Sequence, residues 1–549
     1  MPMPEQETVW PPANWIKAYL SYAENDAWWT GDKATLEAIY NGSHDLMTQV
    51  RGGALQNIVQ SIRKKGRGLF WGGGDAQNPG TRPRVRSHLP AAANLATLSS
   101  DLQFAQSPSF LIPGKDQDED DPLVVALNET MNTDRVLAGL GVYGETKSAL
   151  GAGICVPMWD QDLAPGEVWF ETFGPDTAIP EFRNGRLAAV TLWSEVQEGS
   201  VYWRLLTYHG VDKGAGYIEI GLFEGRRDNL GKRVDLGAHD LGRPYVDPEV
   251  SKIDASSRIA TGLTRLDAVY GINTPTIEWR KDPTLRYAGR SDFAQLHGLF
   301  DDLDQTWTSL MRDLRLGRGR LFIPSTYLQS MGRGNGASFD DMAEYVTKVE
   351  MPGDIIDGGL PIKGQQFEIR VDEHEQTLNA TYREILRKAG FSPSAWGDGG
   401  GQDGGQITAT EVDDRNAASE RTRKKKNLHD RQTLGELARI MLEVRNAQGY
   451  GTEVLPDRVL PYVDFPEMSQ DAPKETAETV AMLNAAGAIS LLQKVARANP
   501  GWTSKQVSEE VKAIMRERNQ EMPDPTTLGR VLDEAQDADE AGDEDDELE

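Results

Sequence analysis

The sequence lacks the features that mark several classes of protein. Among its 549 residues there is one cysteine, Cys155. A single cysteine excludes an intrachain disulfide framework and any zinc site built from several cysteines, and it fits a reducing cytoplasm. No apolar run approaches the roughly 18 residues that cross a bilayer, and the opening MPMPEQETVWPP has no secretory pattern. We therefore expect a soluble protein with no membrane partner.

Catalytic signatures are missing or incomplete. GLGVYG, Gly139–Gly144, has a dinucleotide-binding spacing, but helix precedes it and strands follow, whereas that motif needs a strand before and a helix after. No complete phosphate-binding loop and no G-x-S-x-G nucleophile elbow occur. DEHE at 372–375 resembles a metal site, and it also fits the exposed start of a helix. We expect no cofactor, no metal and no catalytic residue. An enzyme acting on nucleotides or DNA through GLGVYG or DEHE stays open as an alternative.

Acidic residues outnumber basic ones. The formal net charge is −27, from 58 Lys and Arg against 85 Asp and Glu. Part of the excess lies in the tail DEAQDADEAGDEDDELE, which has almost no apolar residue and is expected to be disordered. An acidic chain does not hold nucleic acid tightly along its surface. The basic block RTRKKK, Arg421–Lys426, indicates either nucleic-acid contact or a helix face paired with acidic neighbours.

The spacing of apolar residues predicts an α+β protein. Residues 1–150 have mainly helical spacing, and residues 154–285 hold short β-branched and aromatic runs separated by turns such as RNGR, which indicates antiparallel hairpins. A helix is expected from Ser291, capped there or at Asp292, and a second one from 373. Short strands are expected between them. The apolar stripe of the first helix consists of Leu296, Leu299, Leu303, Trp307, Leu310 and Leu314, and that of the second of Leu378, Tyr382, Ile385, Leu386 and Ala389.

A glycine-rich stretch, SAWGDGGGQDGGQITATEV, separates the second helix from a third. Thr408 and Glu411 have the spacing of a capping box, so the third helix is expected to begin there and to continue to about Asn446. A short β segment, RVLPYVDF, and two or three C-terminal helices follow. Loops of about 16 residues without structure of their own are usually functional or disordered.

The order of these parts resembles the portal proteins of long-tailed bacteriophages, with the closest similarity to those of actinobacterial phages. The residues that carry the resemblance are GRSDFAQLHGLFDDLDQTWTSLMRDLRLGRGRLFIP and SPSAWGDGGGQDGGQITATEVDDRNAASERTRKKK, with the opening WIKAYLSYAENDAWWTGD and the later ETVAMLNAAGAISLLQKV. The resemblance implies a β-rich wing with N-terminal helices (1–285), a first stem helix (286–316), a small α/β clip (317–372), a second stem helix (373–391), a tunnel loop (392–407), a long helix returning into the wing (408–472) and a helical crown (473–530). The acidic tail at 531–549 has no counterpart in the resemblance.

The resemblance also implies a function. Portal subunits form a ring, dodecameric in the family, at one vertex of the capsid, and double-stranded DNA enters and leaves through it. The implied partners are copies of the chain, the major capsid and scaffold proteins, the packaging terminase and later the head-to-tail adaptor. The implied location is the virion, after assembly in the host cytoplasm. Arg318 and Arg320 would lie where the clip docks the terminase or adaptor.

The tunnel loop is expected to face the DNA without holding it. Glycine changes its backbone angles at little cost, and an acidic lining repels phosphates so that DNA slides. Trp396 either offers a flat surface in the channel or anchors the loop against a stem helix. A ring or scaffold protein without DNA passage is a further alternative. The DNA-facing residues would be Trp396, Gly397, Asp398, Gly399, Gly400, Gly401, Gln402, Asp403, Gly404, Gly405 and Gln406.

Overall fold

A computed structural model of the chain describes residues 3–41, 86–114, 121–246, 257–316, 320–324, 346–349, 363–365, 370–396, 409–456, 459–466, 473–499, 502 and 504–521. Within these ranges the protein is α+β, as expected. The acidic tail at 531–549 lies outside the described residues, as do most of the predicted tunnel loop and much of the predicted clip.

Most of the described residues among the first 150 are helical. Gly31 ends the first helix in a left-handed conformation with φ 69°. Asp32 then starts the next one, because its carboxylate accepts the backbone N–H of Ala34 at 3.0 Å. The helices are α1 (Ile16–Thr30), α2 (Lys33–Asn41), α5 (Ala91–Phe104), α6 (Pro122–Met131) and α7 (Asp134–Leu150).

The GLGVYG segment lies inside α7, so it is helix throughout and not the turn of a dinucleotide site. A Cβ at Gly144 would lie 2.7 Å from both Phe104 Cδ2 and Ser100 Oγ. The glycine therefore allows α7 to approach α5 closely, which is a packing role.

Antiparallel strands form the middle of the chain, as the sequence predicted. The main sheet has the order β4-β5-β6-β7-β8, with β9 paired to β7, and a second sheet has the order β10-β2-β3. The RNGR turn joins β4 to β5 through Asn184 (φ 53°) and Gly185 (φ 83°), the pair of positive angles that a tight hairpin needs. The strands are β2 (Ala152–Met158), β3 (Trp169–Phe173), β4 (Ala178–Arg183), β5 (Arg186–Glu198), β6 (Val201–Asp212), β7 (Ala215–Arg226), β8 (Asn229–Val234), β9 (Arg258–Ala260) and β10 (Val269–Ile272).

The expected helix from Ser291 begins six residues later, because α9 spans His297–Leu316. Ser291 does act as a cap, since its Oγ accepts the backbone N–H of Phe293 at 2.9 Å. The turn does not continue into a helix, because Gln295 has a φ of 67°. The prediction of the start was therefore wrong, whereas the predicted apolar stripe is buried at Leu296, Leu303 and Leu310.

A small sheet and a second helix follow α9. The sheet has the order β12-β11-β13, from β11 (Arg320–Pro324), β12 (Val346–Val349) and β13 (Lys363–Gln365). The second helix, α10, spans Val371–Ala389 and ends at Gly390, which has a φ of 86°.

The third helix, α11, spans Ala409–Ala447, close to the predicted range. At about 1.5 Å per residue its length is roughly 58 Å. Its predicted apolar stripe of Leu434, Leu437, Met441 and Val444 is fully buried. The predicted β segment is β14 (Tyr462–Asp464), which pairs with β1 (Ser109–Leu111). The C-terminal helices are α12 (Pro473–Ala485), α13 (Leu491–Ala498) and α14 (Ser504–Glu521).

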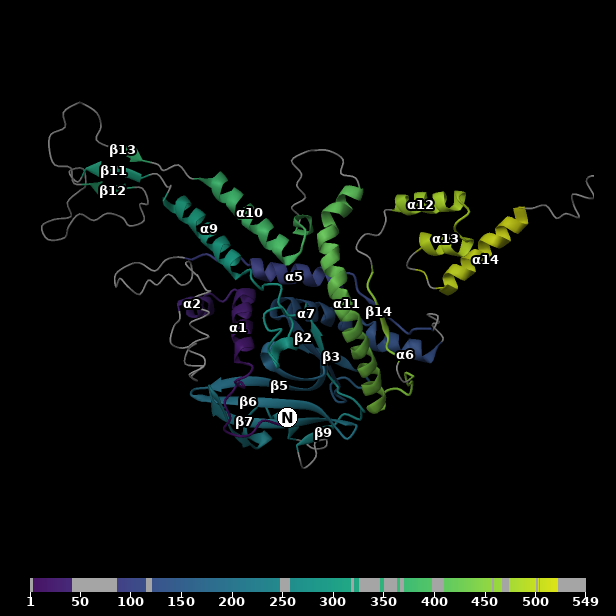
Figure 1. The fold of residues 1–549 in the computed structure, drawn as a ribbon, viewed down its shortest axis with the longest axis horizontal. Coiled ribbons are helices and arrows are strands. Elements are labelled where there is room, and N and C mark those ends of the chain that lie inside the picture. The colour runs from purple at the N-terminus through teal and green to yellow at the C-terminus, as the bar shows by residue number, and fades with distance from the viewer. Residues whose placement is uncertain are drawn as a thin grey trace, which may run out of the picture.

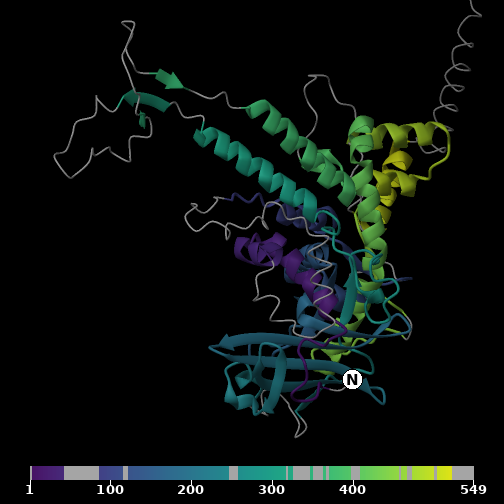
Figure 2. The ribbon, with the colours of Figure 1, turned by 60° about the vertical axis from the view of Figure 1, so that its left-hand side comes forward.

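Figure 1 shows the main sheet at one end of the molecule, with α1, α5, α7 and α11 above it. The α9–α10 hairpin projects from this body toward β11–β13, and α12–α14 lie on the other side (Figures 1 and 2). One core cluster joins α1 and α5 to the base of the hairpin, and a second joins α6 and α7 to α11. Packed side chains at its base thus attach the hairpin to the body.

Candidate functional site

The α9–α10 hairpin projects from the body of the described chain (Figure 2). At its base, Leu303 of α9 and Ile385 and Leu386 of α10 are buried in one cluster. Nearer its tip, the carboxylate of Asp313 lies 3.2 Å from His374 Nε2, and this hydrogen bond holds the pKa of Asp313 below its usual range. His374 of the DEHE segment is therefore bound to the neighbouring helix.

Side-chain hydrogen bonds fasten the end of α10 to α11. Thr422 Oγ1 donates to the carbonyl of Gly390 at 2.6 Å. Ser392 and Ser419 bond reciprocally: Ser392 N lies 2.8 Å from Ser419 Oγ, and Ser419 N lies 3.3 Å from Ser392 Oγ. The chain that leaves α10 is thereby fixed against the side of α11.

The short 3-10 turn η7 (Pro393–Trp396) continues this attachment. Ser394 Oγ donates to Asn416 Oδ1 at 2.7 Å. The segment between Trp396 and Ala409 therefore leaves from a point fixed to α11 and returns into the start of the same helix.

The approach to α9 is fastened to α11 by a buried ion pair. Lys426 Nζ lies 2.5 Å from Asp292 Oδ2 and also donates to Ser99 Oγ at 2.6 Å. Ser148 and Asn273 donate to the same carboxylate. Burial alone would raise the pKa of Asp292, but the Lys426 ammonium and these hydrogen bonds hold it below its usual range. Burial lowers the pKa of Lys426.

A second buried pair lies one helical turn further along α11. Lys147 Nζ is 2.5 Å from Asp430 Oδ2, and both side chains are 0% exposed. Tyr143 Oη donates to Asp430 Oδ1 at 3.0 Å, and Gln103 Nε2 donates to Oδ2 at 2.7 Å. Burial first, and then the Asp430 carboxylate, raise the pKa of Tyr143 well above its usual range. Helices α5, α7 and α11 therefore share one polar junction inside an apolar core.

A histidine–carboxylate contact holds the middle of α9 to the N-terminal part of the body. His88 Nδ1 lies 2.7 Å from Asp304 Oδ2, and Leu89 N donates to Asp304 Oδ1 at 2.8 Å. One helical turn further, Thr308 Oγ1 accepts the backbone N–H of Ser87 at 2.9 Å. The hairpin is thus fastened at its two legs and along α9.

The basic block RTRKKK divides between two environments. Arg423 and Lys426 are buried, and Arg423 bonds Glu420 and the carbonyl of Pro466. Arg421, Lys424 and Lys425 are exposed. The interpretation as a helix face paired with acidic neighbours is correct for the buried members, which are not available to nucleic acid.

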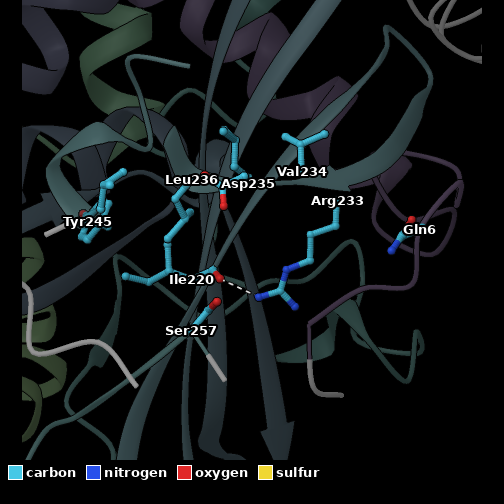
Figure 3. Close-up of a pocket in the computed structure, with 10 residues that line it drawn as sticks. Gln6, Ile220, Arg233, Val234, Asp235, Leu236, Tyr245 and Ser257 are labelled. Carbon is cyan, nitrogen blue, oxygen red and sulfur yellow. Dashed lines mark hydrogen bonds between the residues drawn. The ribbon is translucent and has the colours of Figure 1, made fainter. Parts of the chain in front are cut away.

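The described chain has a surface pocket of about 420 Å³ at one edge of the main sheet (Figure 3). Arg233 points into it, but its Nη2 donates to the carbonyl of Ile220 at 2.8 Å and its Nη1 lies 3.4 Å from Glu219. The guanidinium is therefore already engaged. The pocket lies away from the hairpin and from the residues singled out in the sequence.

Within the described ranges, no group of three or more His, Cys, Asp or Glu side chains is arranged to hold a metal ion. None of the described helices is long and apolar enough to span a bilayer.

The predicted DNA-facing and docking residues fall almost wholly outside the described residues. Trp396 is the last residue of η7, and its side chain is not described. Gly397–Gln406, Thr408 and Arg318 lie outside the described ranges. Glu411 lies in the first turn of α11 and Arg320 begins β11, again without described side chains. These assignments stay predictions.

Sequence reasoning missed the two buried ion pairs. Their signal was present in α11, because Arg423, Lys426 and Asp430 continue the spacing of the buried stripe that begins at Leu434 and Leu437. Charged side chains in register with an apolar stripe indicate buried pairs whose partners come from elsewhere in the chain.

Comparisons with known proteins give little further information. No protein-family model matches the chain, and no curated protein matches it. Among solved structures, a chain of the "Virion of native gene transfer agent (GTA) particle" is similar over 76% of this chain and 95% of its own length. The sequence identity is 12% and the TM-score is 0.34. A likeness of this strength carries no argument about this chain.

Proposed function

We propose that this chain is the portal subunit of a long-tailed bacteriophage, a ring-forming structural protein through which DNA is packaged and ejected. The observation that carries the proposal is the connected unit α9–sheet–α10–α11, in which both legs of a projecting hairpin are fixed to one long helix. The contacts Asp292–Lys426 and Ser392–Ser419 make this connection. They support assigning α9 and α10 to a stem and α11 to the long helix behind it.

The position of the glycine-rich segment fits a channel loop. Its flanking residues, Trp396 and Ala409, belong to elements held against each other by the Ser394–Asn416 bond. A segment with both ends fixed can yield locally to passing DNA while its supports stay in place. Glycine suits such a segment because its backbone rotates at little cost.

The charge of the chain fits DNA that passes but does not bind. Duplex DNA carries one negative charge per about 1.7 Å of its axis, and a ring of subunits with a formal net charge of −27 each repels it. In this proposal the chain has a structural role and no turnover of its own. The energy for packaging comes from a separate protein, the terminase. The other partners in this proposal are the capsid proteins and the head-to-tail adaptor.

The test is the assembly state of the purified chain. Native mass spectrometry with electron-microscope class averages is expected to show a closed ring of about twelve subunits, the number that the family resemblance implies, with an open axial hole. A compact oligomer without a hole would contradict the proposal and favour an enzyme or a scaffold protein.

Docking of the terminase or adaptor is assigned to the small sheet, which begins at Arg320. Charge reversal at Arg318 and Arg320 is expected to weaken the docking of either partner in a pull-down. Arg315→Glu, at an exposed position just before the sheet, is the matched control. Equal capture of both partners by the reversed and control variants would remove this assignment.

A further inference from the structure

Helix α11 presents an outward face that is cationic around an apolar centre. Leu428 is 66% exposed at its middle. Lys424 pairs within its own helix, where its Nζ lies 3.3 Å from Glu420 Oε1. Among the described residues, no carboxylate of another element pairs with the cations around Leu428. We call this set the α11 cationic face; it consists of Arg421, Lys424, Lys425, Leu428 and Arg431.

Helix α7 presents an outward face of the opposite sign, again around an apolar centre. Val142 is 60% exposed, and a Cβ placed at Gly141 beside it would meet nothing within 4 Å. Glu145 stands one turn from Val142 and accepts bonds from Trp29 Nε1 at 3.3 Å and from Thr97 Oγ1 at 3.1 Å. We call this set the α7 acidic face; it consists of Asp134, Ala138, Gly141, Val142 and Glu145, with Asp101 of the adjacent α5. The exposed Arg135 lies on the same stripe, but its Nη1 lies 3.5 Å from Glu167 Oε2 and its guanidinium covers the Trp169 ring, so the carboxylates predominate on this face.

The two carboxylates at the end of this face lie close enough to influence each other. The pKa of Asp101 is raised by partial burial first and then by the charge of Glu145. Two neighbouring carboxylates favour an approaching cation, because a cation relieves their mutual repulsion.

The two faces point away from each other. Lys147 of α7 and Asp430 of α11 are bonded, so these side chains mark the sides on which the two helices meet. At 3.6 residues per turn, Val142 lies on the opposite side of α7 from Lys147, and Leu428 lies on the opposite side of α11 from Asp430. A single copy therefore cannot bring its own two faces together.

We propose that the α11 cationic face of one copy docks on the α7 acidic face of the next copy. Different surfaces of the same chain that meet head to tail generate a ring when the rotation closes. Leu428 lies over Val142 and the open surface at Gly141, and Lys424 and Lys425 reach Glu145 and Asp101. The inference rests on the proposed ring and names the surfaces that close it.

A local cationic face counteracts the net charge of the chain. Copies with a formal net charge of −27 repel one another as they approach. A local cationic face reverses that repulsion in one orientation, and complementary charges fix the register of the contact. An apolar centre inside a charged rim is the usual arrangement of an interface that binds.

The experiment uses two charge-reversed forms of the full chain. One carries Lys424→Glu with Lys425→Glu, and the other carries Asp101→Lys with Glu145→Lys. Native mass spectrometry is expected to show the wild-type ring and at least a tenfold loss of ring for each variant alone. Mixing the two variants is expected to restore rings that contain both in equal numbers, because opposite charges then meet at every contact.

The controls separate assembly from folding and from DNA binding. Arg516→Glu with Arg518→Glu reverses exposed cations on α14 and is expected to leave the ring intact. Glu145→Gln with Asp101→Asn keeps polar side chains at both positions and is expected to weaken assembly less than the lysine variant. Circular dichroism on each variant checks that the fold is retained.

The outcomes distinguish this inference from the proposed function. A Lys424→Glu/Lys425→Glu variant that still forms the wild-type ring overturns the inference and leaves the portal proposal standing. A variant that keeps the ring but loses binding of a short DNA duplex overturns it in favour of a nucleic-acid contact. A wild-type chain that forms only a compact oligomer without a hole overturns both.

Discussion

Lys426 Nζ lies 2.5 Å from Asp292 Oδ2, although 134 residues separate them in the chain. The bond joins the middle of α11 to the turn that leads into α9. Both charges are buried, so each depends on the other for its stabilisation. The same pair therefore fixes where the hairpin leaves the body.

Removing the lysine from this pair should destabilise the fold strongly. A buried carboxylate left without its partner typically costs about 3–5 kcal/mol of unfolding free energy. Lys426→Met is expected to lose that amount in urea unfolding at pH 7. Lys17→Met, on the exposed side of α1, is the matched control and should change stability by less than about 0.5 kcal/mol. Equal stability of the two variants would show that the pair contributes nothing.

Two glycines near the ends of the hairpin should respond in opposite directions to alanine. Gly390 has a φ of 86°, and a Cβ there would lie 2.7 Å from Thr422 Oγ1. Gly390→Ala is expected to cost about 1–2 kcal/mol from the left-handed conformation alone. Gly298 lies in the first turn of α9, where a Cβ would meet nothing within 4 Å, so Gly298→Ala is expected to stabilise by up to about 0.5 kcal/mol, less than in a helix interior. Thermal unfolding of the two variants side by side checks both signs.

The local rules of helix and strand formation account for what the sequence predicted well. The stripe of Leu434, Leu437, Met441 and Val444 placed the buried side of α11, and the RNGR turn placed the first hairpin of the main sheet. Both depend only on neighbours in the chain. Such patterns predicted the α+β class and the order of most described elements.

What the sequence did not predict depends on partners far along the chain. Ser291 has the side chain of a helix cap, but Asp292 forms an ion pair with Lys426 and Gln295 has a positive φ. The helix therefore starts later than the sequence predicted. In the same way, the segment RTRKKK alone does not indicate which of its cations is buried, because the buried partner of Lys426 is Asp292, which lies far away in the chain. Neither the local pattern of a helix cap nor the number of charged residues in a segment indicates which distant residue a side chain will bind.

Stability should fall as the pH rises through the range in which Asp176 ionises. Burial first, with the nearby Asp26 carboxylate, raises the pKa of Asp176 to about 6, above its value of 3.8 in the absence of the fold. The folded state therefore favours the protonated form. Between pH 4 and pH 7 the wild-type protein should lose roughly 2–3 kcal/mol relative to Asp176→Asn, which cannot ionise.

The measurement is urea unfolding of both proteins at each unit of pH from 4 to 7. Relative to Asp176→Asn, the wild-type protein should lose stability mainly between pH 4 and about pH 6, and the difference should level off between pH 6 and pH 7, where Asp176 is ionised in both states. Parallel pH profiles for the two proteins would show that Asp176 ionises in the fold as it does in the unfolded chain.

The glycine-rich segment offers the sharpest test of the proposed channel. Gly399→Val, Gly400→Val and Gly401→Val together restrict the backbone, because a β-branched side chain excludes most conformations that glycine adopts. If the segment yields to DNA, the triple variant should assemble rings of normal mass but package shortened genomes, which pulsed-field electrophoresis of capsid DNA measures. Gly542→Val, in the acidic tail, is a control of the same chemistry. Full-length genomes packaged at the wild-type rate by the triple variant would show that DNA does not press on this segment, and the chain would then be better described as a ring scaffold without DNA passage.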